Sequence, residues 1–313
     1  MRLPNFFLAG VPKASTTSLY HYLGQHPRIY MSPIKEPNFF AAEIREENCD
    51  PRYRKILARQ NRALGEFLAG PMREQRFGGI VANWDDYLRL FANADGETAL
   101  GEASVCYFWS PTAPARIAEK IPGAKILVML RHPAERAFSQ YLHGVGTGMI
   151  RWSLREHIQR NLRQGSDQFS VDYPFLEFGM YSGPLARYRQ HFGSNVWVGF
   201  HEDFSRSPAE TLRNIFGFLG VAVDFPPDFS RRHLKAELPR LAAFGRLRNS
   251  RLWRMAVRAT PASVRPLIRG VLMRRPEGFG MDPEDRRYLI DYYREDIDAL
   301  AGMTGRDLDA WLR

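Results

Sequence analysis

The chain has 313 residues, 44% of them hydrophobic and 25% charged, and a formal net charge of +10 at pH 7. This composition argues against disorder. The positive charge favours an anionic partner, although a basic, solvated surface explains it equally well. The two cysteines, Cys49 and Cys106, are too few for a disulfide framework or a structural zinc site. Because we find neither a signal-peptide pattern nor a run of about 20 apolar residues, we expect a cytoplasmic protein without a transmembrane segment.

Strand and helix patterns alternate along the chain. In order, they predict a strand at 5–10, a helix at 16–25, a strand at 28–31, helices near 52–69 and 84–92, a strand at 124–130, a helix from Pro133, a strand at 195–200, and helices at 208–219 and 283–301. The apolar run at 124–130 is typical of a central parallel strand that is covered on both faces. The alternation predicts an α/β fold with a central, mostly parallel sheet flanked by helices.

Arginines recur through residues 240–275, with apolar residues between them. This segment is predicted to form helices that break at Pro261 and Pro266. The simpler interpretation is a helical face that covers the sheet and exposes its arginines. The alternative is a platform for an acidic acceptor or for peripheral contact with a membrane surface.

The turn after the first strand carries Lys13 followed by small and hydroxyl residues. In an open α/β sheet, ligands bind beyond the carboxyl ends of the strands, where the N–H groups of a helix N-terminus attract anions. Lys13 adds a full charge, and the hydroxyls of Ser15, Thr16, Thr17 and Ser18 add donors. The sequence therefore predicts a P-loop-like phosphate-binding turn. A helix capped by Ser15 or Thr16, with a bystander lysine, is the alternative.

The P-loop of nucleoside triphosphatases has a different order, G-x-x-x-x-G-K-[ST], with the lysine late in the loop. Here the order is G-V-P-K-A-S-T-T, without a second glycine. A magnesium-binding aspartate after a buried strand is also required, and Asp203 could supply it. A nucleotide kinase or NTPase that uses Mg-ATP therefore stays open as an alternative. A third hypothesis is a non-enzymatic polyanion-binding protein that acts through 240–275.

Two motifs resemble those of sulfotransferases that use 3′-phosphoadenosine 5′-phosphosulfate (PAPS). "PKASTTSLYHYL" at 12–23 resembles their 5′-phosphosulfate loop, and "RHPAERAFSQY" at 131–141 resembles their 3′-phosphate motif. Further segments resemble the branch of heparan sulfate sulfotransferases and their bacterial relatives: "KEPNFF" at 35–40, "GEASVCYF" at 101–108, "GMYSGPLARY" at 179–188 and "HEDF" at 201–204. The resemblance covers nearly the whole length, which implies a single domain over residues 1–313.

The resemblance implies that PAPS is bound at both of its charged ends and released as 3′-phosphoadenosine 5′-phosphate. The 5′ end would be held by Lys13, Ala14, Ser15, Thr16, Thr17 and Ser18. The 3′-phosphate would be held by Arg131 and Ser139, with Tyr181 also in the cofactor site and with Arg136, Arg274 and Arg275 as secondary candidates. Lys13 would also neutralise charge on the departing phosphate. We expect no metal and no nucleic-acid partner.

The resemblance also implies that Glu36 is the base that takes a proton from an acceptor hydroxyl or amine. A free glutamate has a pKa of about 4.3; burial beside Phe39 and Phe40 would raise it, whereas Lys35 would oppose that. His143 and Glu102 are the reserve candidates for the base. The acceptor is expected to be a carbohydrate, a lipid or a small metabolite.

Two positions depart from the family pattern. Ser15 stands where the phosphosulfate loop usually has glycine, so either the backbone there is not left-handed or the position tolerates a side chain. Ala103 stands where the heparan enzymes usually have lysine, which reduces the positive charge on the acceptor side.

Overall fold

The computed structural model describes residues 2–165, 168–230, 238–239, 273–274 and 280–313. The predicted helices of the 240–275 segment lie outside these residues, except for Met273–Arg274 (β9), which pairs antiparallel with Leu238–Pro239 (β8). None of the described helices has the length and hydropathy needed to span a bilayer. The single domain over 1–313 stays a prediction.

The centre of the molecule is a five-stranded sheet in the order β2-β5-β1-β6-β7, and each neighbouring pair runs parallel. This confirms the predicted α/β class. Four of its strands match predicted ones, and the bounds are β1 (Phe6–Gly10), β2 (Ile29–Met31), β6 (Lys125–Leu130) and β7 (Val196–Phe200).

The fifth strand, β5 (Ala99–Ala103), was not predicted, although all its residues are buried. Its sequence, ALGEA, contains small residues and a glutamate instead of an apolar run. Gly101 is needed because it lies opposite Phe6 on β1, and an added Cβ would overlap the Phe6 ring. Tertiary packing therefore places this strand where local pattern does not.

The predicted helices are present with small shifts at their ends: α1 (Thr16–Leu23), α2 (Pro51–Ala69), α3 (Trp84–Arg89), α6 (Pro133–Gly146), α10 (Pro208–Leu219) and α14 (Pro283–Thr304). Proline opens four of them, where its missing N–H costs no hydrogen bond. Further helices are α4 (Cys106–Trp109), α5 (Ala113–Lys120), α7 (Leu154–Gln164), α8 (Ser182–Phe192) and α9 (His201–Arg206). The short strands β3 (Ile34–Lys35) and β4 (Arg76–Phe77) pair with each other.

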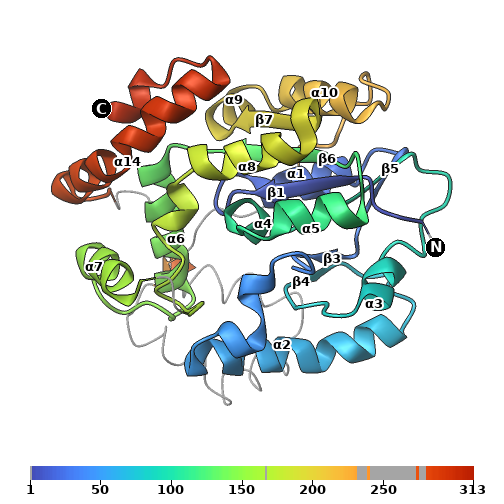
Figure 1. The fold of residues 1–313 in the computed structure, drawn as a ribbon, viewed down its shortest axis with the longest axis horizontal. Helices are drawn as coiled ribbons and strands as arrows, with labels where there is room; N and C mark the ends of the chain where they lie inside the picture. Colours follow the sequence, from blue (N-terminus) through green and yellow to red (C-terminus); the bar gives the residue numbers. More distant parts are fainter. Residues whose placement is uncertain (1, 166–167, 231–237, 240–272, 275–279) are drawn as a thin grey trace.

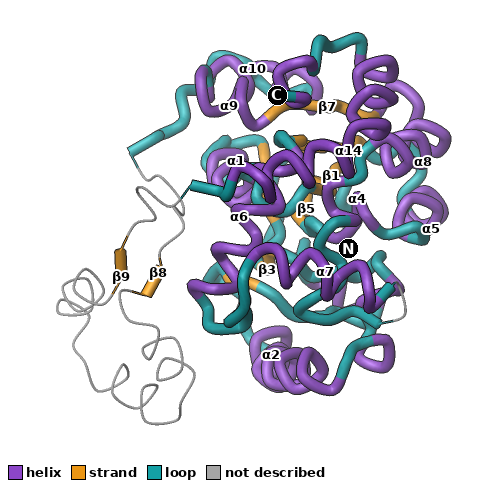
Figure 2. Tube along the Cα trace, turned by 90° about the vertical axis from the view of Figure 1, so that its left-hand side faces the viewer, coloured by secondary structure: helices purple, strands orange, loops and turns teal. Residues whose placement is uncertain are grey.

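The helices form layers on both faces of the sheet. Figure 1 shows α4, α5 and α8 in front of the strands, and in Figure 2 the strands lie between these helices and α1. Helix α2 and helix α10 lie at opposite ends of the molecule in both views.

The parallel arrangement brings the carboxyl ends of all five strands to one edge of the sheet. The chain moves from β1 to one side, through β2 and β5, and then crosses to β6 and β7 on the other side. The gap between β1 and β6 is thus the topological switch point, where open α/β sheets bind ligands. The turn after β1 and the residue after β6, Arg131, meet there.

The contact between Gly101 and Phe6 gives a test of the sheet. We expect Gly101→Ala to lower the free energy of unfolding by about 1–3 kcal/mol, because the core has no space for the methyl group. Gly65→Ala is the matched control: Gly65 lies inside α2 with nothing near its Cβ position, so alanine should raise the same quantity by about 0.5–1 kcal/mol. Urea denaturation measures both; equal effects would contradict the β1–β5 register.

Candidate active site

The turn between β1 and α1 has an unusual backbone. Lys13 (φ 68°) and Ser15 (φ 64°) are both left-handed, a conformation that costs a non-glycine residue about 1–2 kcal/mol. Hydrogen bonds to the neighbouring strand ends hold the turn. The N–H of Val11 donates to the carbonyl of Met129 (2.9 Å), and Nη1 of Arg131 donates to the carbonyl of Lys13 (2.9 Å).

Ser15 adopts the left-handed conformation and keeps its side chain, which decides between the two alternatives that the sequence left open. Its Oγ lies 2.8 Å from Nδ1 of His201, the first residue of α9. Ser15 is the N-cap residue of α1, yet its side chain makes no capping hydrogen bond. The capping hypothesis therefore does not account for Ser15, and its hydroxyl connects the turn to the end of β7.

Positive charge is concentrated at this turn. Burial, together with the charge of Arg131, lowers the pKa of Lys13 to about 8, while Glu36 acts in the opposite direction. Burial also lowers the pKa of Arg131. For His201, burial and the nearby Arg131 lower the pKa to about 4, so its ring is neutral near pH 7. Two part-buried cations whose charges act on each other form a site that favours an anion.

Arg131 is held from both sides. Its guanidinium bonds to the Lys13 carbonyl, and its own carbonyl accepts a hydrogen bond from the hydroxyl of Tyr181 (2.8 Å). Tyr181 is fully buried, and its N–H donates to Oδ2 of Asp296 on α14 (2.6 Å). The structure therefore places Tyr181 behind Arg131, as a support for it.

The two cofactor-site candidates on α6, Arg136 and Ser139, differ in exposure. Ser139 is half-buried, one turn after Arg136, which is fully buried. The guanidinium of Arg136 donates to Oε1 of Gln140 (2.5 Å) and to the carbonyl of Phe175 (2.6 Å). Its Nε is buried and has no hydrogen-bond partner among the described residues. Arg136 thus has structural partners, and its cofactor role stays a prediction.

Glu36 follows β3 and approaches the same turn, since its charge acts on Lys13. Its N–H donates to the carbonyl of Ala103 at the end of β5 (2.7 Å), and Oε1 accepts from Nζ of the buried Lys35 (2.7 Å). Its side chain is 32% exposed. The carboxylate is thus only partly buried, and the rings of Phe39 and Phe40 pack against Tyr87 and Trp84.

The two reserve candidates for the base, Glu102 and His143, differ in burial. Glu102 on β5 is completely buried, and its carboxylate accepts hydrogen bonds from Tyr87, Ser104 and Tyr107. Burial raises the pKa of Glu102 to about 7, although these hydroxyls and Lys35 lower it. His143 is exposed on α6. Arg274 belongs to β9, and Arg275 lies outside the described residues.

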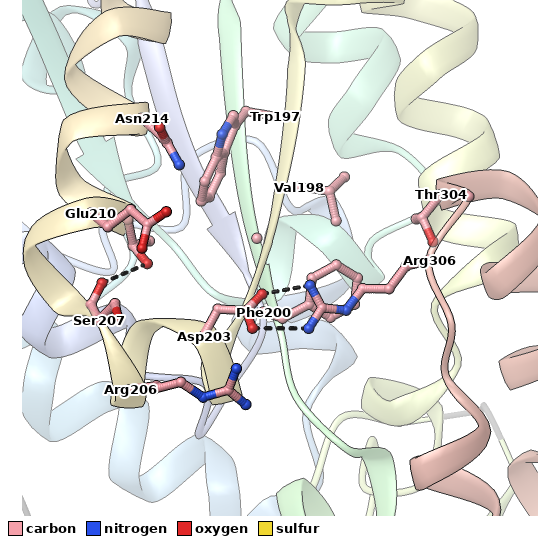
Figure 3. A pocket seen from close by; sticks show the side chains of 13 residues that line it. Trp197, Val198, Phe200, Asp203, Arg206, Ser207, Glu210, Asn214, Thr304 and Arg306 are labelled. Carbon is pink, nitrogen blue, oxygen red and sulfur yellow. Dashed lines mark hydrogen bonds and ion pairs between the residues drawn. The ribbon is translucent and has the colours of Figure 1, made fainter.

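A separate, open pocket of about 660 Å³ lies along β7, between α9, α10 and the end of α14 (Figure 3). None of the predicted PAPS-binding residues lines it. Asp203, the candidate magnesium ligand of the kinase alternative, makes two hydrogen bonds there to Arg306, of 2.5 and 2.9 Å. Its carboxylate therefore faces a guanidinium.

The described residues contain no group of three histidine, cysteine, aspartate or glutamate side chains arranged as for a metal ion. The predicted absence of a metal stays a prediction. The described residues thus form a candidate anion site at the β1–β6 switch point, around Lys13 and Arg131. The partly exposed carboxylate of Glu36 lies within electrostatic range of Lys13.

The sequence profile of the sulfotransferase family matches residues 4–225, and the chain belongs to this family. It is 29% identical to a sulfotransferase from Alicyclobacillus acidocaldarius of known crystal structure, with a TM-score of 0.72 and coverage of 100% of both chains. This confirms the predicted family and fold.

Two curated relatives are also similar to the chain. They are the bifunctional heparan sulfate N-deacetylase/N-sulfotransferases 1 of Xenopus laevis and 2 of Homo sapiens, each 26% identical over 323 residues. The match covers all of this chain but only 31% of each relative, so the chain spans about a third of their length. Membership of the sulfotransferase family argues against the kinase and polyanion-binding alternatives.

Sequence reasoning did not identify His201 as part of the site. The signal was present, because "HEDF" begins at the carboxyl end of a predicted strand, as Arg131 does. Lys35 was considered only as an opposing charge, whereas the structure buries it and bonds it to Glu36.

The left-handed Ser15 gives a test of the turn. We expect Ser15→Ala to lower the free energy of unfolding by about 1–3 kcal/mol, because it removes the hydrogen-bond partner of the part-buried His201 ring. Ser15→Gly loses the same hydrogen bond but accommodates the positive φ, so it should be more stable than Ser15→Ala by about 1 kcal/mol. Urea denaturation compares the two; equal stabilities would contradict the left-handed backbone.

Proposed function

We propose that this protein transfers a sulfuryl group from PAPS to a hydroxyl or amine of an acceptor, with Glu36 as the base. The observation that carries the proposal is the 2.9 Å hydrogen bond between Arg131 and the Lys13 carbonyl. It joins the two segments that resemble the 5′-phosphosulfate and 3′-phosphate motifs. A single adenosine carrier can therefore contact both of them.

The residues at the switch point fit such a donor. The N-terminus of α1 carries no cap from the Ser15 side chain, so its N–H groups can face an anion. Thr16, Thr17 and Ser18 begin this helix and would hold the 5′-phosphate together with Lys13. Arg131 and Ser139 would hold the 3′-phosphate, because a guanidinium can contact two phosphate oxygens at once.

The bound donor supplies the sulfuryl group, and the protein supplies position and charge. A bond forms from the acceptor oxygen or nitrogen to sulfur, while the bond from sulfur to the bridging phosphate oxygen breaks. Lys13 would face that bridging oxygen and stabilise the charge that develops on it. This effect is large because the ammonium group is poorly solvated.

Glu36 would accept the proton that the acceptor loses. Its Oε1 is held by Lys35, and the side chain is partly exposed, so a substrate can reach the carboxylate. The proton then leaves to solvent after the transfer. Lys35 contributes by orienting the carboxylate.

The proposed acceptor is first of all a carbohydrate. The names of the curated relatives include N-sulfation of heparan sulfate, which favours a carbohydrate amine or hydroxyl. The proposal also includes lipid and small-metabolite acceptors, a place for Tyr181 in the cofactor site and a cytoplasmic location.

Binding of the desulfated carrier tests the donor site. We expect 3′-phosphoadenosine 5′-phosphate to bind without metal, and Lys13→Ala to weaken binding about 10- to 100-fold, the loss of one hydrogen bond to a charged group. Lys55→Ala, which removes an exposed lysine on α2, should leave binding unchanged. Titration calorimetry measures all three proteins. A preference for Mg-ATP over the bisphosphate would refute the proposal.

The pH dependence of the same binding tests the role of Lys13. The pKa of Lys13 is about 8 in the free protein, and the phosphates are fully ionised above pH 7 because their second pKa is about 6. As the pH rises above 8, Lys13 loses its proton before the carrier binds. Affinity should then fall, approaching tenfold per pH unit. Lys13→Arg should remove this dependence, since a guanidinium stays charged; a wild-type profile that is flat from pH 8 to 9.5 would contradict the assignment.

A further inference from the structure

The segment that carries Glu36 has a backbone that needs restraint. Glu36 (φ 68°) and Asn38 (φ 55°) are left-handed without being glycine. Such residues keep this conformation only where the surroundings impose it. The N–H of Glu36 is fixed by the carbonyl of Ala103, but the next amides of the segment have no strand to pair with.

Two side-chain hydroxyls accept hydrogen bonds from amides of this segment, as the carbonyls of a neighbouring strand would. The N–H of Asn38 donates to Oγ of Ser104 (3.2 Å), and the N–H of Phe40 donates to the hydroxyl of Tyr107 (3.2 Å). Both hydroxyls donate in turn to the carboxylate of Glu102, each at 2.7 Å. Above its pKa of about 7 the Glu102 carboxylate is ionised and only accepts hydrogen bonds, so it turns both hydroxyl protons toward itself. Their lone pairs are then directed at the two amides.

Burying the carboxylate of Glu102 costs free energy, so its position calls for an explanation. Its side chain is 0% exposed in the central sheet, and a buried carboxylate needs several donors. The hydroxyl of Tyr87 is a third donor at 3.1 Å. The charge of Lys35 also acts on Glu102, so the carboxylate helps to compensate the buried ammonium group that holds Glu36.

We propose that Glu102 is a positioning residue for the transfer reaction: through Ser104 and Tyr107 its carboxylate fixes the backbone of residues 36–40 and so aims Glu36 at the acceptor. This proposal rests on the proposed function of Glu36 and replaces the reserve role of Glu102 as a base. A completely buried carboxylate cannot touch an acceptor. The hydroxyls of Ser104 and Tyr107 form two hydrogen-bonded relays that connect it to the segment that carries Glu36.

The variant Glu102→Gln tests the proposal, because it keeps the volume but turns one acceptor oxygen into a donor. Hydrogen–deuterium exchange, resolved to single amides at pH 8, should show Asn38 and Phe40 exchanging at least tenfold faster than in the wild type. The amides of Val11 and of strand β6 should be unchanged. Faster exchange throughout the sheet, or unchanged exchange at both loop amides, would overturn the proposal.

Single-hydroxyl variants separate the two relays and serve even where Glu102→Gln does not fold. Ser104→Ala should accelerate exchange at Asn38 only, and Tyr107→Phe at Phe40 only. Tyr87→Phe is the matched control: it removes a hydroxyl that bonds to Glu102 and to no amide of residues 36–40 among the described contacts. It should leave both amides protected. Equal acceleration by Tyr87→Phe would show that the hydroxyl relays do not carry the effect.

Kinetics distinguish positioning from general structural support. With PAPS as donor and water as acceptor, Glu102→Gln should lower kcat at least tenfold and leave KM for PAPS and the Kd of 3′-phosphoadenosine 5′-phosphate within twofold of the wild type. A matching loss in Kd would overturn the positioning role. If the wild type does not bind the bisphosphate, the proposed function fails, while the exchange at Asn38 and Phe40 still decides whether Glu102 holds the loop.

Discussion

The hydrogen bond from Arg131 to the carbonyl of Lys13 is the contact on which the site depends. It exists because β1 and β6 are parallel neighbours whose carboxyl ends meet at one edge of the sheet. The chain leaves this edge in opposite directions from the two strands. An arginine after one strand can therefore support a turn after the other, and the charge of Arg131 acts on Lys13.

The residues around this gap adopt arrangements that cost free energy. Lys13, Ser15 and Glu36 have left-handed backbones, and Lys35 and Glu102 are charged groups with almost no exposed surface. Local contacts compensate these costs. Hydrogen bonds to residues at strand ends hold Lys13 and Glu36 by their backbones and Ser15 by its side chain, and the charge of Lys35 acts on Glu102. Strain and buried charge are concentrated at the carboxyl edge, where a ligand would bind.

Local patterns predicted the parts of the fold and site that depend on neighbouring residues. The turn at Lys13 was predicted because it combines a strand, a turn and a helix within a few residues, whereas the role of Arg131 was implied by the resemblance to the 3′-phosphate motif. The strand β5 was missed because Gly101 is required by Phe6, a residue 95 positions away in sequence. His201 was missed as the partner of Ser15 for the same reason. Glu102 was considered as a base because sequence alone does not show that a carboxylate is buried.

The C-terminal helix α14 lies beyond the 4–225 region that defines the family match, yet a chain of contacts connects it to Arg131. Asp296 on α14 fixes the backbone of Tyr181 and Ser182, and the Tyr181 hydroxyl fixes Arg131. Arg306, just past the helix, binds Asp203 on α9, which begins with His201. A fragment that ended at residue 225 would keep the residues of both phosphate motifs. It would lose Asp296 and Arg306, which hold Tyr181 and Asp203. The family match therefore ends before residues that hold Tyr181 and Asp203 in place.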